Sequence, residues 1–472
     1  MRGLVALAAL TWAADAQAHA FGQSYVLPVP FSLYAWASVA ALLLSFVVAA
    51  GFLRPGPASA AKTGKAWLLP AWLVTSSRLL ALVALLLTLA TGFLGPRDPY
   101  LNAAMTLFWI LFVLGLTYAS ALLGDLFTVI SPWRLLVLEL RQITRRDTSL
   151  PLDEGVSRWL PTLLYGVFIG IELFADLGPR GLAAMLTTYT LAIVLAGWWL
   201  GPAWLARVEL FEVILGWLGR CAPCQLVPQR HSLQLHLRWP LQGLLARPAD
   251  HVGEGLLILC LLAATAYDGL HMTEVWGRLS WQLLQALLRP WLGDDIVTAW
   301  PVLKQAHMAW SLLTLALAPL LYAVACLAAL HLARRLAGST LSLSELACRF
   351  APSLLPIVLV YHASHYYTLL LTQGPQIGWL LADPFGLGWR LLPAERLPVT
   401  ALLPAMGTVW HTQVGLILAG HVASVWLAHH EALRCFGSVR AAWLSQLPML
   451  VLMMAMTVSG LWILAQPISA TG

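Results

Sequence analysis

Long apolar runs separated by short polar segments dominate the hydrophobic pattern of this 472-residue chain. A helix needs about 17 to 25 apolar residues to cross the hydrocarbon core of a bilayer. After the opening segment the chain has ten such runs, at residues 31–53, 78–95, 103–124, 159–176, 179–200, 255–272, 309–333, 350–371, 404–428 and 446–466. The pattern therefore predicts an all-α fold, a polytopic bundle of transmembrane helices with ten spans.

Composition narrows the class of protein further. The chain is 60% hydrophobic and 10% charged, with a mean hydropathy of +0.78, which excludes a soluble domain. If the first span runs inward, the inner segments hold nineteen lysines and arginines and the outer segments seven. Because cytoplasmic loops carry such an excess, we expect both termini of the mature chain in the periplasm and the protein in the bacterial inner membrane. We expect the lipid bilayer as a partner and no nucleic acid.

The opening segment has the pattern of an export signal. A basic residue precedes twelve apolar residues and the small-x-small triplet Ala16-Gln17-Ala18. Cleavage after this triplet removes a signal peptide, 1–18, and makes His19 the first residue of a single transmembrane domain, 19–472. Two alternatives stay open: cleavage after Ala20, and an uncleaved anchor, for which twelve apolar residues are short.

Three longer segments lie between the spans. Residues 201–254 are predicted to be cytoplasmic and contain the apolar stretch GPAWLARVELFEVILGWLG, which either lies along the interface or dips back into the membrane. Residues 273–308 and 373–403 are predicted to be periplasmic and, being rich in Trp, Leu and Pro, to form short surface helices that roof a site. The spacing of Cys221 and Cys224 permits a redox pair or half of a zinc site, but we expect two reduced cysteines at the end of a helix.

Ionisable side chains inside the spans carry the most information about function, because each is costly in a bilayer unless it is paired, hydrated or useful. Asp268 and His271 are spaced i, i+3 in one span, as are His362 and His365 in another, so each pair lies on one helical face. At 1.5 Å per residue, these four and His411 lie about 7 to 16 Å below the outer surface. We expect a layer of histidines and carboxylates in the outer half of the bilayer.

Imidazole and carboxylate groups together are ligands for zinc, copper, iron or manganese. The candidate metal ligands are His19, His271, His362, His365, His411 and Asp268. A divalent transition metal held by three or four of them would activate water for a hydrolase, with Asp268 or Glu172 as the catalytic carboxylate. Alternatively, His19 would bind copper through its amine and imidazole, as in a metal carrier or an oxidative copper site. Each histidine alone is also explained as a hydrogen-bonded structural residue, and a metal-free scaffolding protein is a third interpretation.

The chain also resembles a known family. The resemblance rests on HAFGQSYVLPVP at the mature start, SPWR at 131–134, FEVILGWLGRCAP at 211–223, TAYDGL at 265–270, ASHYYTLLL at 363–371, and the C-terminal stretch that begins GHVASVWLAHHEALRCFG. In the same order, these segments resemble the bacterial multi-pass membrane proteins named after fenitrothion hydrolase. The resemblance implies hydrolysis of a lipophilic organophosphorus triester that reaches a periplasmic-side site from the lipid, with nitrophenolate leaving. It carries over no catalytic motif, and metal handling through His19 stays the alternative.

Overall fold

The protein folds as a helical membrane domain in the computed structural model, which describes residues 29–52, 66–150, 153–228, 232–292, 296–393 and 404–467. A helical segment lies at each of the ten predicted spans. Within the described ranges, eight helical segments are long and apolar enough to cross a membrane. The remaining two, α8 (Glu154–Phe174) and α19 (Met406–Cys435), are of similar length and are interrupted by polar side chains. The chain is a multi-pass, all-α membrane protein, as its apolar pattern predicts.

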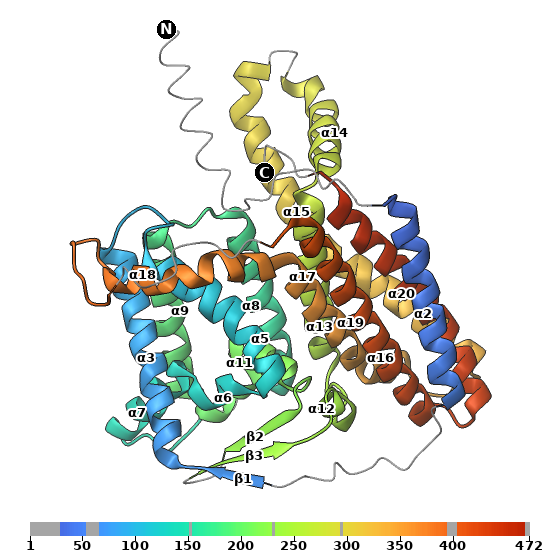
Figure 1. The fold of residues 1–472 in the computed structure, drawn as a ribbon, viewed down its shortest axis with the longest axis horizontal. Coiled ribbons are helices and arrows are strands. Elements are labelled where there is room, and N and C mark those ends of the chain that lie inside the picture. The colour runs from blue at the N-terminus through green and yellow to red at the C-terminus, as the bar shows by residue number, and fades with distance from the viewer. Residues whose placement is uncertain are drawn as a thin grey trace.

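The helices form two groups that lie side by side (Figure 1). The first group contains α3 (Ala71–Leu94), α4 (Ala103–Met105), the π-helix Thr106–Gly115, α5 (Leu116–Leu123), α6 (Leu126–Ile130), α7 (Pro132–Ile143), α8, α9 (Pro179–Leu200), the 3-10 turn Pro202–Trp204, α10 (Leu205–Val208) and α11 (Leu210–Gly219). The second group contains α2 (Phe31–Phe52), α12 (Gln242–Ala246), α13 (Val252–His271), α14 (Glu274–Leu292), α15 (Ile296–Leu336), α16 (Leu343–Phe350), the 3-10 turn Ala351–Leu354, α17 (Leu355–Gln373), α19 and α20 (Val439–Ala465). The groups meet where α8 packs on α13 and the π-helix packs on α17.

The two ends of the bundle differ. One end carries a three-stranded antiparallel sheet in the order β1-β3-β2, formed by β1 (Ala66–Leu69), β2 (Cys224–Pro228) and β3 (Leu233–Leu237). The opposite end carries the beginning of α2, the end of α20 and the hairpin of α14 and α15 (Figure 1). We call these the sheet end and the terminal end. The distribution of basic residues predicts that the sheet end faces the cytoplasm.

The segment 273–308 does not form the short surface helices that its composition predicts. The helix α14 has 19 residues and α15 has 41, so that α15 alone is about 60 Å long at 1.5 Å per residue. Together they project from the terminal end as a hairpin (Figure 1). Trp281 stacks on Trp300 and on His307 and joins the two helices. The Trp-rich segment therefore packs helix against helix instead of lying on the membrane surface, because aromatic side chains of α14 and α15 stack on each other.

The segment 373–403 behaves differently. After α17 the chain continues through the 3-10 turn Gly374–Gln376 into α18 (Ile377–Ala382), a helix of six residues. This stretch crosses the terminal end of the first group (Figure 1). The last residues of the segment, 394–403, lie outside the described ranges, as do the predicted signal peptide and His19.

Two segments of the first group enter the bundle from the sheet end and return to it. The helices α5 and α9 each end at a glycine with a positive φ, 101° at Gly124 and 91° at Gly201, a conformation that a side chain would strain. A short helix follows in both cases, and then a half-length helix begins at a capped N-terminus. The Ser131 hydroxyl caps α7, and the Glu209 carboxylate accepts N–H groups of the first turn of α11.

The capped N-termini of α7 and α11 lie at mid-height of the bundle. Tyr189, halfway along α9, donates a hydrogen bond to Glu209, and Trp133 Nε1 donates to the hydroxyl of Thr190 at 3.0 Å. The 12 residues of α7 and the 10 of α11 correspond to about 18 and 15 Å, roughly half a bilayer. The apolar stretch in 201–254 therefore dips back into the bundle, the second of the two alternatives that the sequence leaves open.

An ion pair joins the two half-helices. Arg134 is the third residue of α7 and Glu212 the third residue of α11, and their side chains, 19% and 2% exposed, contact each other. Trp133 and Phe211, which directly precede Arg134 and Glu212, pack with Phe127 in one buried aromatic cluster. Non-helical backbone is tolerated at membrane depth only where protein or a cavity surrounds it, and this cluster supplies that surrounding.

Candidate functional site

Asp268 is the centre of a polar network where the two helix groups meet. It lies in the last turn of α13 and is 2% exposed. Its Oδ2 accepts a hydrogen bond from the Tyr366 hydroxyl at 2.6 Å and lies 2.8 Å from Nε2 of His365. Because His365 and Tyr366 are neighbours on α17, a single helix turn supplies both contacts. Sequence spacing brought Asp268 and His365 to one depth, and the structure brings them into contact.

A small cavity borders this network. Its volume is about 80 Å³, and its polar lining includes Glu172 from α8 and His362 and Tyr366 from α17. His362 Nδ1 lies 3.3 Å from the hydroxyl of Tyr118 on α5, so this contact crosses from the second helix group to the first. The cavity thus gathers a carboxylate, an imidazole and a phenol beside Asp268.

The structure also describes two further members of the predicted histidine layer, His271 and His411. His271 packs its ring against Phe174, with the ring centroids 5.3 Å apart. His411 lies toward α2, where its Nε2 is 3.5 Å from the Tyr34 hydroxyl and its Nδ1 is 2.6 Å from the Gly407 carbonyl oxygen. His19 lies outside the described residues. Helical rise predicts depth but not the direction in which a side chain points, and His411 shares the depth of Asp268 while its ring contacts Tyr34 and Gly407.

The arrangement is a hydrogen-bonded acid-base network. Among the residues that the structure describes, no three His, Cys, Asp or Glu side chains are placed to hold a metal ion together. In the network itself, His365 Nε2 is directed at the Asp268 carboxylate, and His362 Nδ1 faces a phenol. The prediction of a metal with three or four of these ligands stays untested, because His19 is not among the described residues.

The tyrosines are the part of this site that sequence reasoning missed. Tyr366 and Tyr118 each contact a predicted site residue. The signal that could have identified Tyr366 is its place directly after His365, in a span otherwise rich in Leu. A phenol in a membrane span is a weaker indication of function than a carboxylate, because burial of an uncharged hydroxyl costs less free energy.

The two cysteines that follow α11 lie at the sheet end. Both are free thiols, and Cys224 begins β2. Burial raises the pKa of the Cys221 thiol to about 12, which keeps this thiol protonated and unreactive at neutral pH.

A second, larger cavity opens at the sheet end. Its volume is about 530 Å³, and α11 forms one wall through Glu212, Gly216 and Trp217. The small cavity beside Asp268 is lined by other residues of the same helix, Ile214 and Leu218 among them. The half-helix α11 therefore stands between the two cavities. We call the larger one the sheet-end cavity.

No family model, curated protein or solved structure matches this chain. Its function is therefore inferred from the geometry of the two cavities and of the network between the helix groups.

Proposed function

We propose that the protein is a proton-coupled membrane transporter in which Asp268 is the proton-binding group. The observation that carries this proposal is the Asp268 carboxylate, 2% exposed inside a membrane domain and held by Tyr366 and His365. An ionisable group at such a position is costly, and chains of Asp, Glu and His within membrane spans commonly relay protons.

The size of the adjacent cavity supports protons over a larger ligand. A water molecule needs roughly 10 to 15 Å³ of such space, so about 80 Å³ holds a few waters. Pockets for drug-sized ligands measure about 300 to 1,000 Å³. Water beside Glu172, His362 and Tyr366 would connect these groups to Asp268 as a proton path.

The position of the network between two helix groups supports coupling to a conformational change. A charged carboxylate accepts stronger hydrogen bonds than a neutral acid, so protonation of Asp268 weakens its contacts with His365 and Tyr366. One turn earlier on α17, His362 contacts Tyr118 of the other group at 3.3 Å. Proton binding therefore biases the packing of α17 against the first group, and many transporters work by rocking one helix group against another.

The half-helices provide the second part of the argument. Broken helices whose ends meet inside the membrane commonly build the substrate sites of transporters. Here the N-termini of α7 and α11 meet at the pair Arg134–Glu212, and α11 lines both the network cavity and the sheet-end cavity. A small movement of α11 would change the access between them.

The test is the charge that moves when the pH is changed. The purified protein is reconstituted into liposomes on a solid-supported membrane, and the transient current after a pH jump is recorded without any substrate. We expect a current in the wild type that falls to the level of empty liposomes in Asp268→Asn. The matched variant His411→Gln, altered at a histidine outside the network, should keep it. A wild-type current no larger than that of empty liposomes would refute the proposal.

One observation favours hydrolysis as a second candidate function. A carboxylate in contact with an imidazole, as in Asp268 and His365, is an arrangement that orients a general base. A lipophilic triester does not fit the cavity of about 80 Å³, so hydrolysis would require the helix groups to separate. Nitrophenolate release from a fenitrothion-like triester in lipid vesicles, present in the wild type and lost in Asp268→Asn, would support it. Release at the same rate in both would exclude a role of this network.

A further inference from the structure

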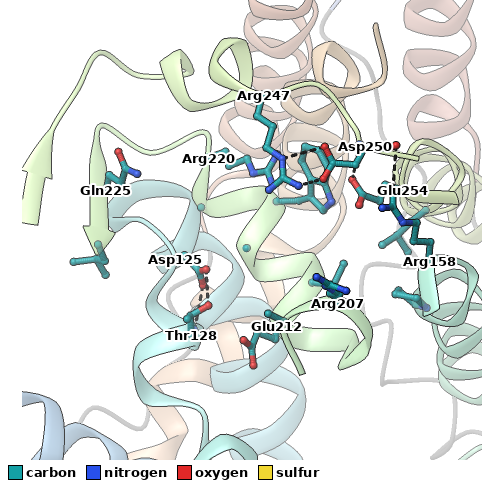
Figure 2. A pocket seen from close by; sticks show the side chains of 18 of the residues that line it. Asp125, Thr128, Arg158, Arg207, Glu212, Arg220, Gln225, Arg247, Asp250 and Glu254 are labelled. Atoms are coloured by element: carbon teal, nitrogen blue, oxygen red, sulfur yellow. Dashed lines mark hydrogen bonds and ion pairs between the residues drawn. The ribbon is translucent and has the colours of Figure 1, made fainter. Parts of the chain in front are cut away.

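The sheet-end cavity is rich in arginine. Five arginines line it, together with four acidic residues: Arg158, Arg207, Arg220, Arg238 and Arg247, with Asp125, Glu212, Asp250 and Glu254. Figure 2 shows Arg220 and Arg247 near each other on one wall, with Asp125 and Glu212 on the opposite side of the cavity. A volume of about 530 Å³ lies within the range of small-molecule sites.

The acidic residues of the cavity already have partners. Glu212 is paired with Arg134, and Asp250 with Arg247. Asp125 accepts hydrogen bonds from the backbone N–H and the hydroxyl of Thr128, at 3.2 and 2.6 Å.

The fourth acid, Glu254, accepts the backbone N–H of Asp250 at 3.2 Å. It lies within electrostatic range of both Arg220 and Arg247, so it lowers the positive potential of this wall without forming an ion pair with Arg220.

Arg220 differs from the other four arginines. Arg158 and Arg207 lie near Glu154, Arg247 is paired with Asp250, and Arg238 donates to two backbone carbonyls at 2.9 and 3.0 Å. In the described part of the chain, Arg220 has no carboxylate within 4 Å. Its Nη1 is shielded from solvent and has no hydrogen-bond partner among the described residues.

The position of Arg220 is fixed by packing. Its guanidinium lies over the ring of Trp217, 3.7 Å from the ring centroid, an attractive cation–π arrangement. Trp217 and Leu257 add an apolar surface to the same cavity. A guanidinium that packs over an indole ring can still donate its N–H groups to a ligand, and these donors suit the planar oxygens of a carboxylate or the oxygens of a phosphate.

We infer that the sheet-end cavity binds a small organic anion, whose carboxylate or phosphate group is held by Arg220 and whose apolar body lies against Trp217 and Leu257. This inference rests on the proposed transporter, because it names the class of substrate that would be carried. The anion contacts the face of α11 opposite the network cavity, so the anion site and the network cavity share this half-helix as a wall.

The test measures binding directly, on the full-length protein purified in detergent. Benzoate and phenyl phosphate serve as probes, with benzyl alcohol as a neutral control of similar shape. A ligand that binds only the folded state raises the thermal unfolding midpoint in a concentration-dependent manner. Titration of this midpoint gives an apparent Kd for wild type, Arg220→Gln, Arg220→Lys and Arg278→Gln. Arg278 is the matched control, since it lies on α14 and is paired with Glu274.

We expect at least one anionic probe, and not benzyl alcohol, to stabilise the wild type and Arg278→Gln. Arg220→Gln should raise the apparent Kd at least tenfold, which corresponds to about 1.4 kcal/mol, and Arg220→Lys should raise it less. Stabilisation equal in wild type and Arg220→Gln would overturn the inference, as would no stabilisation by either anion. If Arg220→Gln does not fold, equal affinity in Arg220→Lys and wild type overturns it, and weaker binding supports it. Asp268→Asn separates the two proposals, because it should abolish the pH-jump current and keep anion binding.

Discussion

Replacement of Arg134 by methionine should be strongly destabilising, because it leaves a buried charge without its partner. Glu212 is 2% exposed, and in the part of the chain that the structure describes its Oε2 has no hydrogen-bond partner. In Arg134→Met the Glu212 carboxylate stays buried and loses the guanidinium that balances its charge. Removal of one partner from a buried ion pair costs about 3 to 5 kcal/mol.

The surface pair Arg278–Glu274 sets the comparison. Its N–O distance is 3.0 Å, but its side chains are 66% and 47% exposed. Exposed pairs contribute about 0 to 1 kcal/mol, so Arg278→Met should cost less than about 1 kcal/mol. The double variant Arg134→Met/Glu212→Met should recover most of the loss, because a buried ion pair replaced by apolar side chains of similar volume is often neutral or stabilising.

The assay is equilibrium unfolding by sodium dodecyl sulfate in mixed micelles, followed by tryptophan fluorescence. The free energy of unfolding is compared for the wild type, the two single variants at the buried pair and the double variant, which together form a cycle that isolates the interaction. If Arg134→Met costs no more than Arg278→Met, the half-helices are not held together by this pair, and the description of the two re-entrant segments as one buried unit is wrong.

Two further predictions concern packing and thiol chemistry. A Cβ at Gly460 of α20 would overlap the Tyr361 phenol of α17, so Gly460→Ala should lower the free energy of unfolding by about 1 to 3 kcal/mol in the same assay; unchanged stability would show that the two helices are not in close contact. Because burial raises the pKa of Cys221 to about 12, N-ethylmaleimide at neutral pH should modify this thiol only after denaturation, as read by peptide mass spectrometry. Rapid modification of the folded protein would contradict its burial.

The membrane spans could be predicted from the sequence because the length of an apolar run is a local property. The small sheet could not, since β1 and β3 are 164 positions apart at their closest described residues, Leu69 and Leu233, and each strand is too short to be distinguished alone. For a similar reason, the sequence alone could not decide whether α11 lies along the membrane interface or returns into the membrane. What decides it is the contact of Glu209 with Tyr189 and of Glu212 with Arg134, all between different elements.

The candidate site was predictable from the sequence only in part of its membership. Depth along each span correctly brought Asp268 and His365 together. It also grouped His411 with them, although the rotation and tilt of α19 direct that side chain toward Tyr34. Rotation about a helix axis depends on packing against neighbours, and spans with low amphipathicity give little indication of it.

The most direct test of the central claim is infrared difference spectroscopy on the reconstituted protein. Spectra recorded before and after acidification report the C=O stretch of carboxyl groups that take up a proton. We predict a band from a carboxyl group in an apolar environment that is absent in Asp268→Asn and unchanged in Asp383→Asn, an aspartate on the exposed stretch after α18. If the wild type and Asp268→Asn give the same spectrum over the whole pH range in which the protein stays folded, Asp268 does not exchange protons with water, and the proposed coupling is wrong.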